Sequence, residues 1–444
     1  MARLFGTDGV RGIAGIELTA ELAMKIGKGT ASVLTKDREN VKIIVGNDGR
    51  ESSDMLISAI ISGLTSIGVD VIDVGMIPTP AISYLVKHYK IDAGIMVTAS
   101  HNSYEYNGIK IFDENGYKLA DELEDDIEDY VTNNKNNKSS KIGKVIKCDN
   151  GLLDYIEYLI TAKEEDFSNL HIAVDAANGA TSISSNTLLS KIGIKYDLIN
   201  NNPNGKNIND NCGALHLDKL SEYVIKNKLD GGVAFDGDGD RSIFVDEKGN
   251  VIDGDYILAI LALELKKNNK LNNNTVVGTI MSNLGLIKFC EDNNINFIAT
   301  KVGDRYVLEE LNTNNLSLGG EQSGHIIIKD FANTGDGELT MINILNTLSR
   351  NNKKFSEIAS IMKKYPQVTE NVKVNTLKKN EFYTNEEIKK NIEVINNILK
   401  DKGRIVVRPS GTEPLIRIMI EGEDIDEIDR LAKGLALVVE RVLN

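Results

Sequence analysis

The sequence predicts an α/β protein with three similar domains built on mostly parallel sheets, followed by a smaller α+β domain. Three observations support this fold class. The chain of 444 residues is too long for a single core and suggests about two to four domains. A series of strand, helix, strand, helix and strand occurs three times along the chain. After Pro366 this pattern ends and a different one begins.

The first repeat begins with the apolar strand VKIIVGNDGR at residues 41–50. An amphipathic stretch from Ser52 to Ile67 predicts a helix, and IGVDVIDVG predicts the second strand. A second helix reaches His88, and the third strand IDAGIMV ends in the polar loop TASHN. Short apolar strands that alternate with helices of about 12 to 16 residues predict a parallel sheet covered by helices.

The other two repeats have the same order of elements. The second runs from LHIAVDAANGA at residues 170–180 to LDGGVAFDGDGD at residues 229–240, and the third from residue 274 to GEQSGH at residues 320–325. Where the first repeat has TASHN, these repeats end in DGDGD and GEQSGH. Ligands of such sheets bind beyond the carboxyl ends of the strands. If the repeats pack around one cleft, we expect the three loops to meet there.

The chain after Pro366 predicts a small α+β domain. It contains a helix from Glu386 to Leu399, a pair of strands within residues 403–422 and a last helix from Asp424. The clearest linker is TNNKNNKSSK, which starts at Thr132. The predicted domains are residues 1–150, 151–252, 253–367 and 368–444.

Composition and charge narrow the classes of function. Apolar residues make up 41% of the chain and charged residues 26%, which is typical of a soluble globular protein. The net charge of −14, without a basic stripe, argues against a nucleic-acid partner, so an anionic ligand would need a local cluster of Arg, Lys and backbone N–H groups.

Cysteine usage and the apolar segments indicate where the protein works. The three cysteines are far apart and odd in number, which fits free thiols in a reducing compartment. The first residues lack an apolar signal segment. The longest apolar stretch, YILAILALEL from Tyr256, is far shorter than the roughly 18 residues that span a bilayer. We therefore expect a cytoplasmic protein that has no membrane contact.

The segment DGDGDR predicts a metal site. It spaces Asp236, Asp238 and Asp240 two residues apart, and the glycines between them let the chain curve so that the carboxylates converge. Three like charges at a buried strand end repel unless a cation compensates them, and Mg²⁺ and Ca²⁺ prefer such oxygen ligands. One alternative is a solvated acidic turn. The other, an EF-hand, is opposed by Arg241 at the position that requires Gly and by strand patterns on both sides.

Ser100 ends the third strand of the first repeat, at the position equivalent to the acidic loop. Adjacent residues of an extended chain point to opposite faces, so we expect His101 to be badly placed to deprotonate Ser100. The G-x-S-x-G motif of serine hydrolases is absent. Ser100 alone could be a helix N-cap or a turn hydroxyl. Its place in the repeat favours a hydroxyl or a phosphoserine that joins the metal.

Two loops offer groups for a phosphorylated sugar. RPSGTEP, from Arg408 to Pro414, lies between two strands and can hold a phosphate through its guanidinium, hydroxyls and backbone N–H groups. A plain hairpin turn is the alternative. In GEQSGH, Glu321 and Ser323 can bind sugar hydroxyls, and His325 follows them.

Three further segments carry cations or turns. GTDGVRG has glycines that permit close backbone approach, together with Arg11, and an ordinary Gly-rich turn is the alternative. NGIK places Lys110 near Ser100 in the sequence. Asp48, Gly49 and Arg50 in GNDGR are typical of a turn rather than a site.

Six motifs occur in the order and spacing of the α-D-phosphohexomutase superfamily: FGTDGVRG, TASHN with NGIK, DGDGDR, KVGDRY, GEQSGH and RPSGTEP. The chain resembles this superfamily over essentially its whole length. The resemblance implies four domains with mixed, mostly parallel sheets in the first three, around one central cleft. FGTDGVRG and GEQSGH are most similar to those members that act on an amino sugar.

The activity that this resemblance implies is the interconversion of glucosamine 6-phosphate and glucosamine 1-phosphate, for cell-wall precursor synthesis. It would pass through a phosphoserine enzyme and a 1,6-bisphosphate intermediate. Glucose or mannose phosphates are the alternative substrates. A metal-dependent phosphatase and a non-catalytic sugar-phosphate binding protein are alternatives of other classes.

The resemblance also implies roles for individual residues. One Mg²⁺ per chain would be held by Ser100, Asp236, Asp238 and Asp240. The implied catalytic residues are Ser100, which carries the phosphoryl group, Arg11, Lys110 and His325, with His101 and Arg241 near the transferred group. The implied substrate contacts are Gly303, Asp304, Glu321, Ser323, Arg408, Ser410, Gly411 and Thr412.

One departure from the superfamily pattern lies beside the serine. The pattern has Pro after TASHN, whereas this chain has Ser103, and the loss of the proline restraint could loosen the loop. The expected partner is a phosphorylated amino sugar, with no nucleic acid and no membrane. A homodimer is left open.

Overall fold

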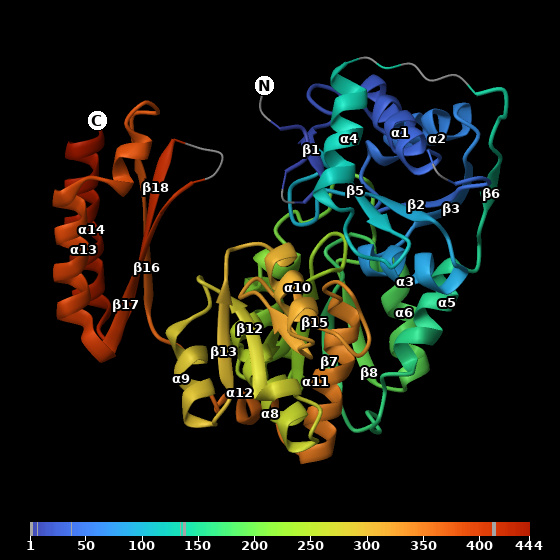
Figure 1. Cartoon of the computed structure of the whole chain (residues 1–444). Helices are drawn as coiled ribbons and strands as arrows, with labels where there is room; N and C mark the ends of the chain where they lie inside the picture. The colour runs from blue at the N-terminus through green and yellow to red at the C-terminus, as the bar shows by residue number, and fades with distance from the viewer. Residues whose placement is uncertain (1–2, 7, 37, 134, 136–138, 411–413) are drawn as a thin grey trace.

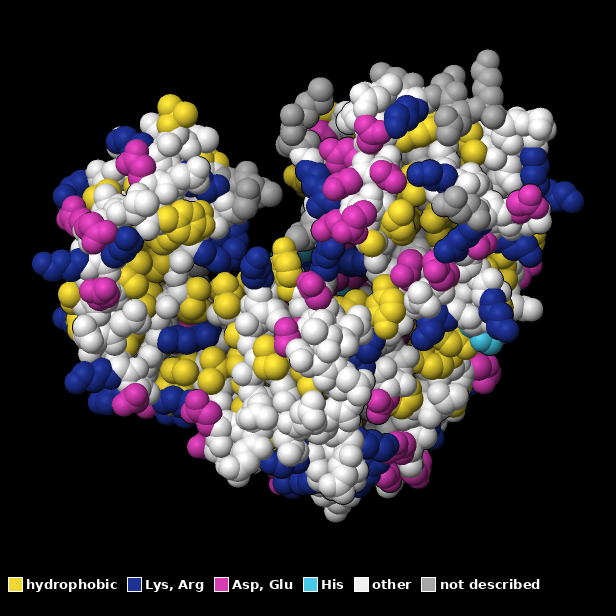
Figure 2. Space-filling view, in the orientation of Figure 1, with side chains coloured by type: hydrophobic (Ala, Val, Ile, Leu, Met, Phe, Trp, Pro, Cys, Tyr) yellow, Lys and Arg dark blue, Asp and Glu magenta, His cyan; other side chains and the backbone are white. Residues whose placement is uncertain are grey.

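The structure is a computed structural model that describes residues 3–6, 8–36, 38–133, 135, 139–410 and 414–444. These residues form four sheets with their helices, which we call domains I to IV in chain order (Figure 1). Domain IV stands apart on the left, and a hollow separates it from domain I (Figure 2). The predicted fold class is confirmed: three α/β domains and a smaller fourth domain surround one cleft.

Domain I holds a six-stranded sheet in the order β1-β5-β4-β2-β3-β6. β2, β3, β4 and β6 run parallel, whereas β5 runs antiparallel to both β4 and β1. β4 is buried along its whole length, as expected for a central parallel strand. The bounds are β1 Val10–Ile13, α1 Ala20–Leu34, β2 Lys42–Asn47, α2 Ser53–Ser66, β3 Asp70–Met76, α3 Thr79–Tyr89, β4 Ala93–Val97, β5 Tyr106–Asp113, α4 Asp121–Thr132 and β6 Val145–Lys147.

Domain II repeats this plan with a five-stranded sheet in the order β11-β10-β9-β7-β8. β7, β8 and β9 are parallel, and the antiparallel strands β10 and β11 follow them. The bounds are α5 Gly151–Ile160, β7 His171–Asp175, α6 Thr181–Ile192, β8 Lys195–Ile199, the short 3₁₀ helix Gly213–Leu215, α7 Asp218–Asn227, β9 Gly231–Phe235, β10 Ser242–Asp246 and β11 Val251–Ile252.

Domain III has four strands in the order β13-β12-β14-β15. β12, β13 and β14 are parallel, and β15 is antiparallel to β14. The bounds are α8 Gly254–Lys267, the 3₁₀ helix Asn272–Asn274, β12 Thr275–Thr279, α9 Leu284–Asp292, β13 Asn296–Thr300, α10 Asp304–Thr313, β14 Leu318–Gly320, β15 Ile326–Ile328, α11 Gly337–Asn351 and α12 Phe355–Ala359.

Domain IV is different, because its three strands are all antiparallel and two long helices cover one face of the sheet (Figure 1). The strand order is β16-β18-β17. The bounds are β16 Gln367–Lys373, the 3₁₀ helix Lys379–Tyr383, α13 Glu386–Leu399, the 3₁₀ helix Lys400–Lys402, β17 Gly403–Pro409, β18 Leu415–Gly422 and α14 Ile425–Leu443.

The hydrophobic cores show which domains are packed together. One core runs without interruption from α3 and α5 through the sheets of domains II and III to α11. A second core lies under α1, α2 and α4 on the other face of the domain I sheet. Domain IV has a core of its own, between its sheet and α13 and α14. Domains I to III therefore form a continuous body, to which domain IV is attached.

No helix among the described residues combines the length and the apolar character that crossing a bilayer requires.

Candidate active site

The loops that end the three repeats meet at one place. In each α/β domain this loop joins the third strand of the repeat to an antiparallel neighbour, β4 to β5, β9 to β10 and β14 to β15. The hydroxyl of Ser100, in the first loop, donates to Oδ2 of Asp236, in the second, at 2.7 Å. Oδ1 of Asp240 lies 3.7 Å from Nδ1 of His325, in the third. The structure thus brings together the loops that the repeat predicted to be equivalent.

Asp236, Asp238 and Asp240 form a compact group of buried carboxylates. One oxygen of each lies within 4.8 Å of the others. Oδ1 of Asp238 and Oδ1 of Asp240 have no hydrogen-bond partner among the described residues. Leaving a buried polar atom without a partner is costly, and a divalent cation with oxygen ligands would satisfy both atoms. The donor set therefore fits a hard metal ion.

The three carboxylates differ in their electrostatic surroundings. Burial and the charges of Asp240 and Asp238 raise the pKa of Asp236 well above its usual value. Burial also opposes the ionised form of Asp240, but Lys110 and other nearby cations outweigh it and hold the pKa of Asp240 well below its usual range. Nζ of Lys110 lies 3.1 Å from Oδ2 of Asp238 and 3.3 Å from Oδ2 of Asp240. Asp236 is thus the carboxylate whose negative charge is least compensated by nearby cations.

Asp8 forms ion pairs with three basic side chains beside these carboxylates. Its Oδ2 lies 2.8 Å from Arg11 and 3.3 Å from Lys110, and its Oδ1 lies 2.6 Å from Lys118. Burial disfavours its charge, but Lys110, Lys118 and Arg11 lower the pKa of Asp8 well below the usual range. Neither Asp8 nor Lys118 was predicted as part of the site. The structure adds both to the predicted Arg11 and Lys110.

Ser100 adopts a backbone conformation that few residues other than glycine take. Its φ is 51°, in the left-handed region, which costs about 1–2 kcal/mol for an L-residue. Its N–H donates to Oγ1 of Thr98 at 2.8 Å, and its carbonyl accepts from Nδ2 of Asn209 in domain II at 2.9 Å. These contacts offset the strain and hold the turn that aims the hydroxyl at Asp236.

His101 does not point away from Ser100, so that expectation is wrong. Its Nδ1 lies 3.2 Å from the hydroxyl of Ser100. The expectation assumed an extended chain, whereas the left-handed turn at Ser100 removes the alternation of side chains. Burial, followed by the charges of Arg241 and Arg11, lowers the pKa of His101 to about 4. Its ring is therefore neutral at neutral pH, and an unprotonated Nδ1 can accept a hydrogen bond from the hydroxyl.

Arg50 holds the serine loop through hydrogen bonds to its backbone carbonyls. The sequence pattern predicts only a turn at Arg50 and does not indicate this role. Nη2 donates to the carbonyl of Ser100 at 2.9 Å, and Nη1 donates to the carbonyls of Tyr106, at 2.9 Å, and Ser103. Nε donates to Oδ2 of Asp48 at 2.8 Å, and both side chains are fully buried. One guanidinium therefore fixes three carbonyls around the serine, including that of the residue that replaces the expected proline.

We predict that Arg50→Lys lowers kcat by about 10-fold and the free energy of unfolding by about 1–3 kcal/mol. Lysine keeps the positive charge beside Asp48 but cannot reach three carbonyls at once, which leaves buried acceptors without partners. Urea unfolding and kcat at saturating substrate would be measured together. Arg350→Lys is the control, because Arg350 pairs with Glu164 and Glu264 far from the serine. A wild-type kcat in Arg50→Lys would contradict the prediction.

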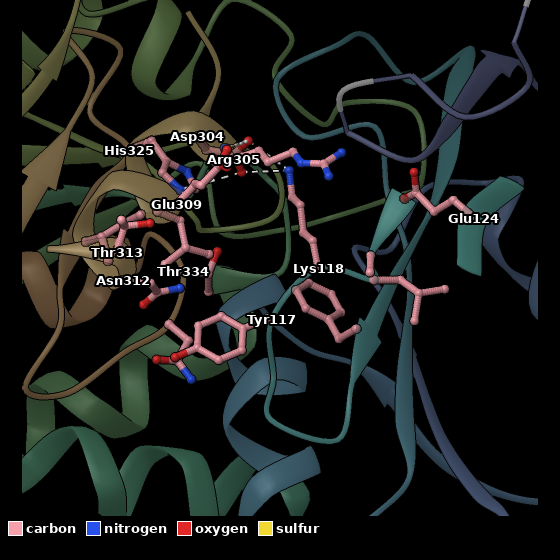
Figure 3. A pocket seen from close by; sticks show the side chains of 16 residues that line it. Tyr117, Lys118, Glu124, Asp304, Arg305, Glu309, Asn312, Thr313, His325 and Thr334 are labelled. Atoms are coloured by element: carbon pink, nitrogen blue, oxygen red, sulfur yellow. Dashed lines mark hydrogen bonds and ion pairs between the residues drawn. The ribbon is translucent and has the colours of Figure 1, made fainter. Parts of the chain in front are cut away.

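Asp304, at the start of α10, faces a cation from domain I. Lys118 donates to its Oδ1 at 2.8 Å, and His325 lies beside the pair (Figure 3). Nε2 of His325 lies 3.8 Å from Oδ2 of Asp304 and accepts the N–H of Gly335 at 3.0 Å. Burial lowers the pKa of His325, whereas Asp240 and Asp304 raise it more. The Gly335 bond opposes that rise, because it requires an unprotonated Nε2, and in the neutral ring the proton lies on Nδ1.

The third loop also carries the predicted sugar contacts. Oε1 of Glu321 accepts the N–H of Gly303 at 3.0 Å, so two of these residues contact each other. The hydroxyl of Ser323 has no hydrogen-bond partner among the described residues. Both residues are partly exposed, although the hydroxyl oxygen of Ser323 is itself buried in this structure.

A cavity of about 280 Å³ lies between domains I and III, and Asp304 and His325 form part of its lining (Figure 3). Neither Ser100 nor any of the three aspartates lines this cavity. We therefore place the chemistry at the carboxylates, outside this cavity.

Domain IV carries the predicted phosphate loop. Arg408 lies directly opposite Arg417 on the neighbouring strand. Burial, and then the charge of Arg417, lower the pKa of Arg408. A phosphate between two adjacent guanidinium groups would relieve their repulsion and form charge-assisted hydrogen bonds. Arg417 was not predicted, although its strand was, and Ser410 is buried beside Arg408. The predicted Gly411 and Thr412 lie outside the described residues.

Models of the four domains of one family, phosphoglucomutase/phosphomannomutase, match the chain in order. They match alpha/beta/alpha domain I at residues 2–138, domain II at 153–249, domain III at 253–365 and the C-terminal domain at 370–438.

Curated relatives and solved structures agree with this match. A phosphoglucosamine mutase of Clostridium botulinum (strain Loch Maree / Type A3) is 50% identical over 446 residues, 99% of each chain. One of Thermoanaerobacter sp. (strain X514) is 50% identical over 448 residues, the whole of both chains. A phosphoglucomutase/phosphomannomutase family protein of Burkholderia thailandensis is 22% identical with a TM-score of 0.83, over 99% of this chain and 97% of that one. An Aspergillus fumigatus N-acetylphosphoglucosamine mutase, solved with GlcNAc-6P and magnesium, has a TM-score of 0.72 at 16% identity, over 99% and 96%.

A buried seryl hydroxyl lies beside three converging carboxylates where the loops of domains I to III meet, and this arrangement suits an enzyme of phosphoryl transfer. The chain belongs to the phosphoglucomutase/phosphomannomutase family. It is therefore a mutase, which is an isomerase.

Proposed function

We propose that this chain interconverts glucosamine 6-phosphate and glucosamine 1-phosphate in the synthesis of cell-wall precursors. The observation that carries the proposal is the 2.7 Å hydrogen bond from Ser100 to Asp236, which unites the phosphoryl carrier of domain I with the carboxylates of domain II. The choice of an amino sugar rests on the relatives that are 50% identical over their full length.

Asp236, Asp238 and Asp240, with the phosphorylated Ser100, would hold one Mg²⁺. When bound, the ion supplies positive charge that stabilises the oxygens of the transferring phosphoryl group. Arg11 and Lys110, gathered at Asp8, supply further cations on the same side of the carboxylates. Arg241 follows the acidic loop directly, and its N–H donates to Oδ1 of Asp236 at 3.1 Å.

The proposed reaction has two transfers. First, the free hydroxyl of the sugar monophosphate attacks the phosphorus of the phosphoserine and gives up its proton. The bond from phosphorus to Oγ of Ser100 breaks, Oγ takes up a proton, and a 1,6-bisphosphate forms. The bisphosphate then turns over and returns its other phosphoryl group to Oγ. In this second step the seryl hydroxyl loses its proton, and the two nearest acceptors are Asp236 Oδ2 at 2.7 Å and His101 Nδ1 at 3.2 Å.

The substrate must touch several loops at once. Glu321 and Ser323 would bind its hydroxyls, Gly303 and Asp304 would complete that side, and the loop of domain IV would bind the phosphate that does not react. Oriented groups reach effective molarities of about 10⁵ to 10⁸ M. Transfer to the bound sugar therefore outcompetes transfer to water.

Two other classes of function are weaker. A metal-dependent phosphatase would use the carboxylates but would not need the paired guanidinium groups of Arg408 and Arg417 across the cleft. A sugar-phosphate binding protein would not need a seryl hydroxyl at the carboxylates. The experiment that separates these classes is to supply glucosamine 6-phosphate and measure both glucosamine 1-phosphate and inorganic phosphate. Phosphate as the main product would overturn the mutase.

We predict that glucosamine phosphate is the best substrate and that glucose phosphate gives lower but detectable activity. Pockets discriminate against one small group by only about 10- to 200-fold, unless a buried partner is left unpaired. Glu321 can pair with hydroxyls of every hexose and cannot select the amine alone. The measurement is kcat/KM for the 1-phosphates of glucosamine, glucose and mannose at one metal concentration. An equal or higher value for glucose or mannose would assign this chain to the other branch of the family.

A further inference from the structure

Domain IV is attached to the rest of the protein through a small polar joint. Glu421, at the end of β18, is fully buried, and its carboxylate accepts the side chain of Asn283 and the N–H of Leu284, each at 3.0 Å. Arg404 donates to the same carboxylate at 2.5 Å and also to the carbonyl of Ser282. We call Asn283, Arg404 and Glu421 the polar joint. Because domain IV has its own core, these directional hydrogen bonds, together with the bond from Lys288 to the carbonyl of Asp401 at 2.8 Å, hold its orientation.

Asn283 is the central residue of the joint. Its Oδ1 accepts the N–H of Gly285, as the N-cap of α9, and the N–H of Tyr365, both at 2.9 Å. Its Nδ2 donates to the carbonyl of Tyr365 and to Glu421, both at 3.0 Å. Every hydrogen-bonding position of the amide is thus used, and Tyr365 lies two residues before β16. Asn283 therefore holds both the segment that leads into β16 and, through Glu421, the end of β18.

The same asparagine is bonded to the loop that carries the sugar contacts. Its N–H donates to Oδ2 of Asp255 at 2.8 Å, and Nε2 of Gln322 donates to that oxygen at 3.1 Å. Asp255 is fully buried at the start of α8, and the carbonyl of Gln322 accepts the N–H of Gly254 at 3.0 Å. Gln322 lies between Glu321 and Ser323. A continuous chain of hydrogen bonds therefore joins Glu421 of domain IV to the sugar loop of domain III.

We propose that Glu421 and Asp255 are positioning residues that set the placement of β17 and β18, which carry Arg408 and Arg417, relative to the sugar loop. This inference rests on the proposed function, in which one sugar phosphate touches both loops at the same time. Neither carboxylate reaches the reacting atoms. They act through Asn283 and Gln322, whose hydrogen bonds connect the end of β18 in domain IV to the sugar loop of domain III.

The test uses Glu421→Gln and Asp255→Ala in the full chain. Both carboxylate oxygens of Glu421 accept donors, so the NH₂ group of glutamine removes at least one of these bonds. Alanine at position 255 removes the oxygen that accepts Asn283 and Gln322, whereas asparagine could keep both bonds, because Oδ1 of Asp255 has no hydrogen-bond partner among the described residues. We expect KM for glucosamine 6-phosphate to rise about 10-fold, with a smaller change in kcat, because binding needs both loops in register. The matched control is Asn346→Ala. Asn346 is a buried amide that bonds to Ala162, Glu164 and Glu165, away from both loops.

A second measurement does not depend on turnover. Hydrogen exchange of residues 320–325 is expected to be faster in Glu421→Gln than in wild type and in Asn346→Ala, although the substitution lies in another domain. The proposal is overturned if exchange of this loop in Glu421→Gln equals that in the control. It is also overturned if wild type is active and the KM of the two variants stays within twofold of the wild-type KM. An inactive wild type would overturn the proposed function instead, and the exchange result would still decide the role of the joint.

Discussion

Replacing Ser100 with alanine is expected to abolish mutase turnover, by at least about 10³-fold, while the fold is retained. The substitution removes the oxygen that carries the phosphoryl group, and no other hydroxyl lies at this distance from Asp236 among the described residues. Asn209 and Arg50 hold the loop through the backbone carbonyl of residue 100, which alanine keeps. The measurement is conversion of glucosamine 6-phosphate, together with the circular dichroism and melting temperature of the variant.

Ser103→Ala is the matched control, because Ser103 lies in the same loop and contributes its backbone carbonyl to Arg50. It should keep wild-type turnover. Intact mass adds an independent readout: wild type is expected to accept one phosphate from glucose 1,6-bisphosphate, and Ser100→Ala none. A tenth of wild-type activity in Ser100→Ala would be enough to reject Ser100 as the carrier.

The repeats made the position of the site predictable from the sequence. TASHN, DGDGD and GEQSGH each follow the third strand of a repeat, and strand periodicity alone places them at equivalent sheet ends. The acidic triad was predictable for a related reason, since its spacing and glycines are local. What periodicity did not reveal was that the strand after each loop runs antiparallel to the strand before it, which makes the sheets mixed.

The residues that sequence reasoning missed act through contacts with distant parts of the chain. Arg50 lies in a segment typical of a turn, and only the folded sheet brings it under three carbonyls of the serine loop. Asp8 and Lys118 are 110 positions apart, and nothing local indicates that they pair. Arg417 becomes significant only through its register with Arg408. The role of a buried charged residue can be inferred only when its partner is known, and the partner is known only from the tertiary structure.

The error at His101 has a different physical cause. The sequence indicated a strand up to Ser100, and the alternation of an extended chain was carried one residue too far. The chain leaves the strand at Val97, and Ser100 has a positive φ, so the rule for strands does not apply there. Non-glycine residues with positive φ are uncommon and concentrate at functional positions. The strain at Ser100 is therefore itself a sign of the site.

Replacing Asp238 with asparagine is expected to lower turnover by about 100-fold at a fixed Mg²⁺ concentration. Oδ2 of Asp238 accepts the hydroxyl of Thr79 at 2.6 Å and lies 3.1 Å from Nζ of Lys110, whereas Oδ1 has no hydrogen-bond partner among the described residues. In the variant these two donors keep the amide oxygen on their side. The NH₂ group then replaces the free oxygen and points at the place of the cation, where it repels a metal instead of binding it.

Metal binding to the Asp238 variant can be measured apart from turnover through the rise of the melting temperature with added MgCl₂. Wild type should show this rise and Asp238→Asn should lose most of it. Asp246→Asn is the matched control, because Asp246 is equally buried at the other end of β10 but binds only its own turn, through Lys248 and Asn250. It is expected to lose stability and keep the Mg²⁺ response. If Asp238→Asn kept the full response, or if wild type stayed active in excess chelator, the three aspartates would not be the metal ligands. The negative charge of the three buried carboxylates would then be compensated by Lys110 and its neighbouring cations alone.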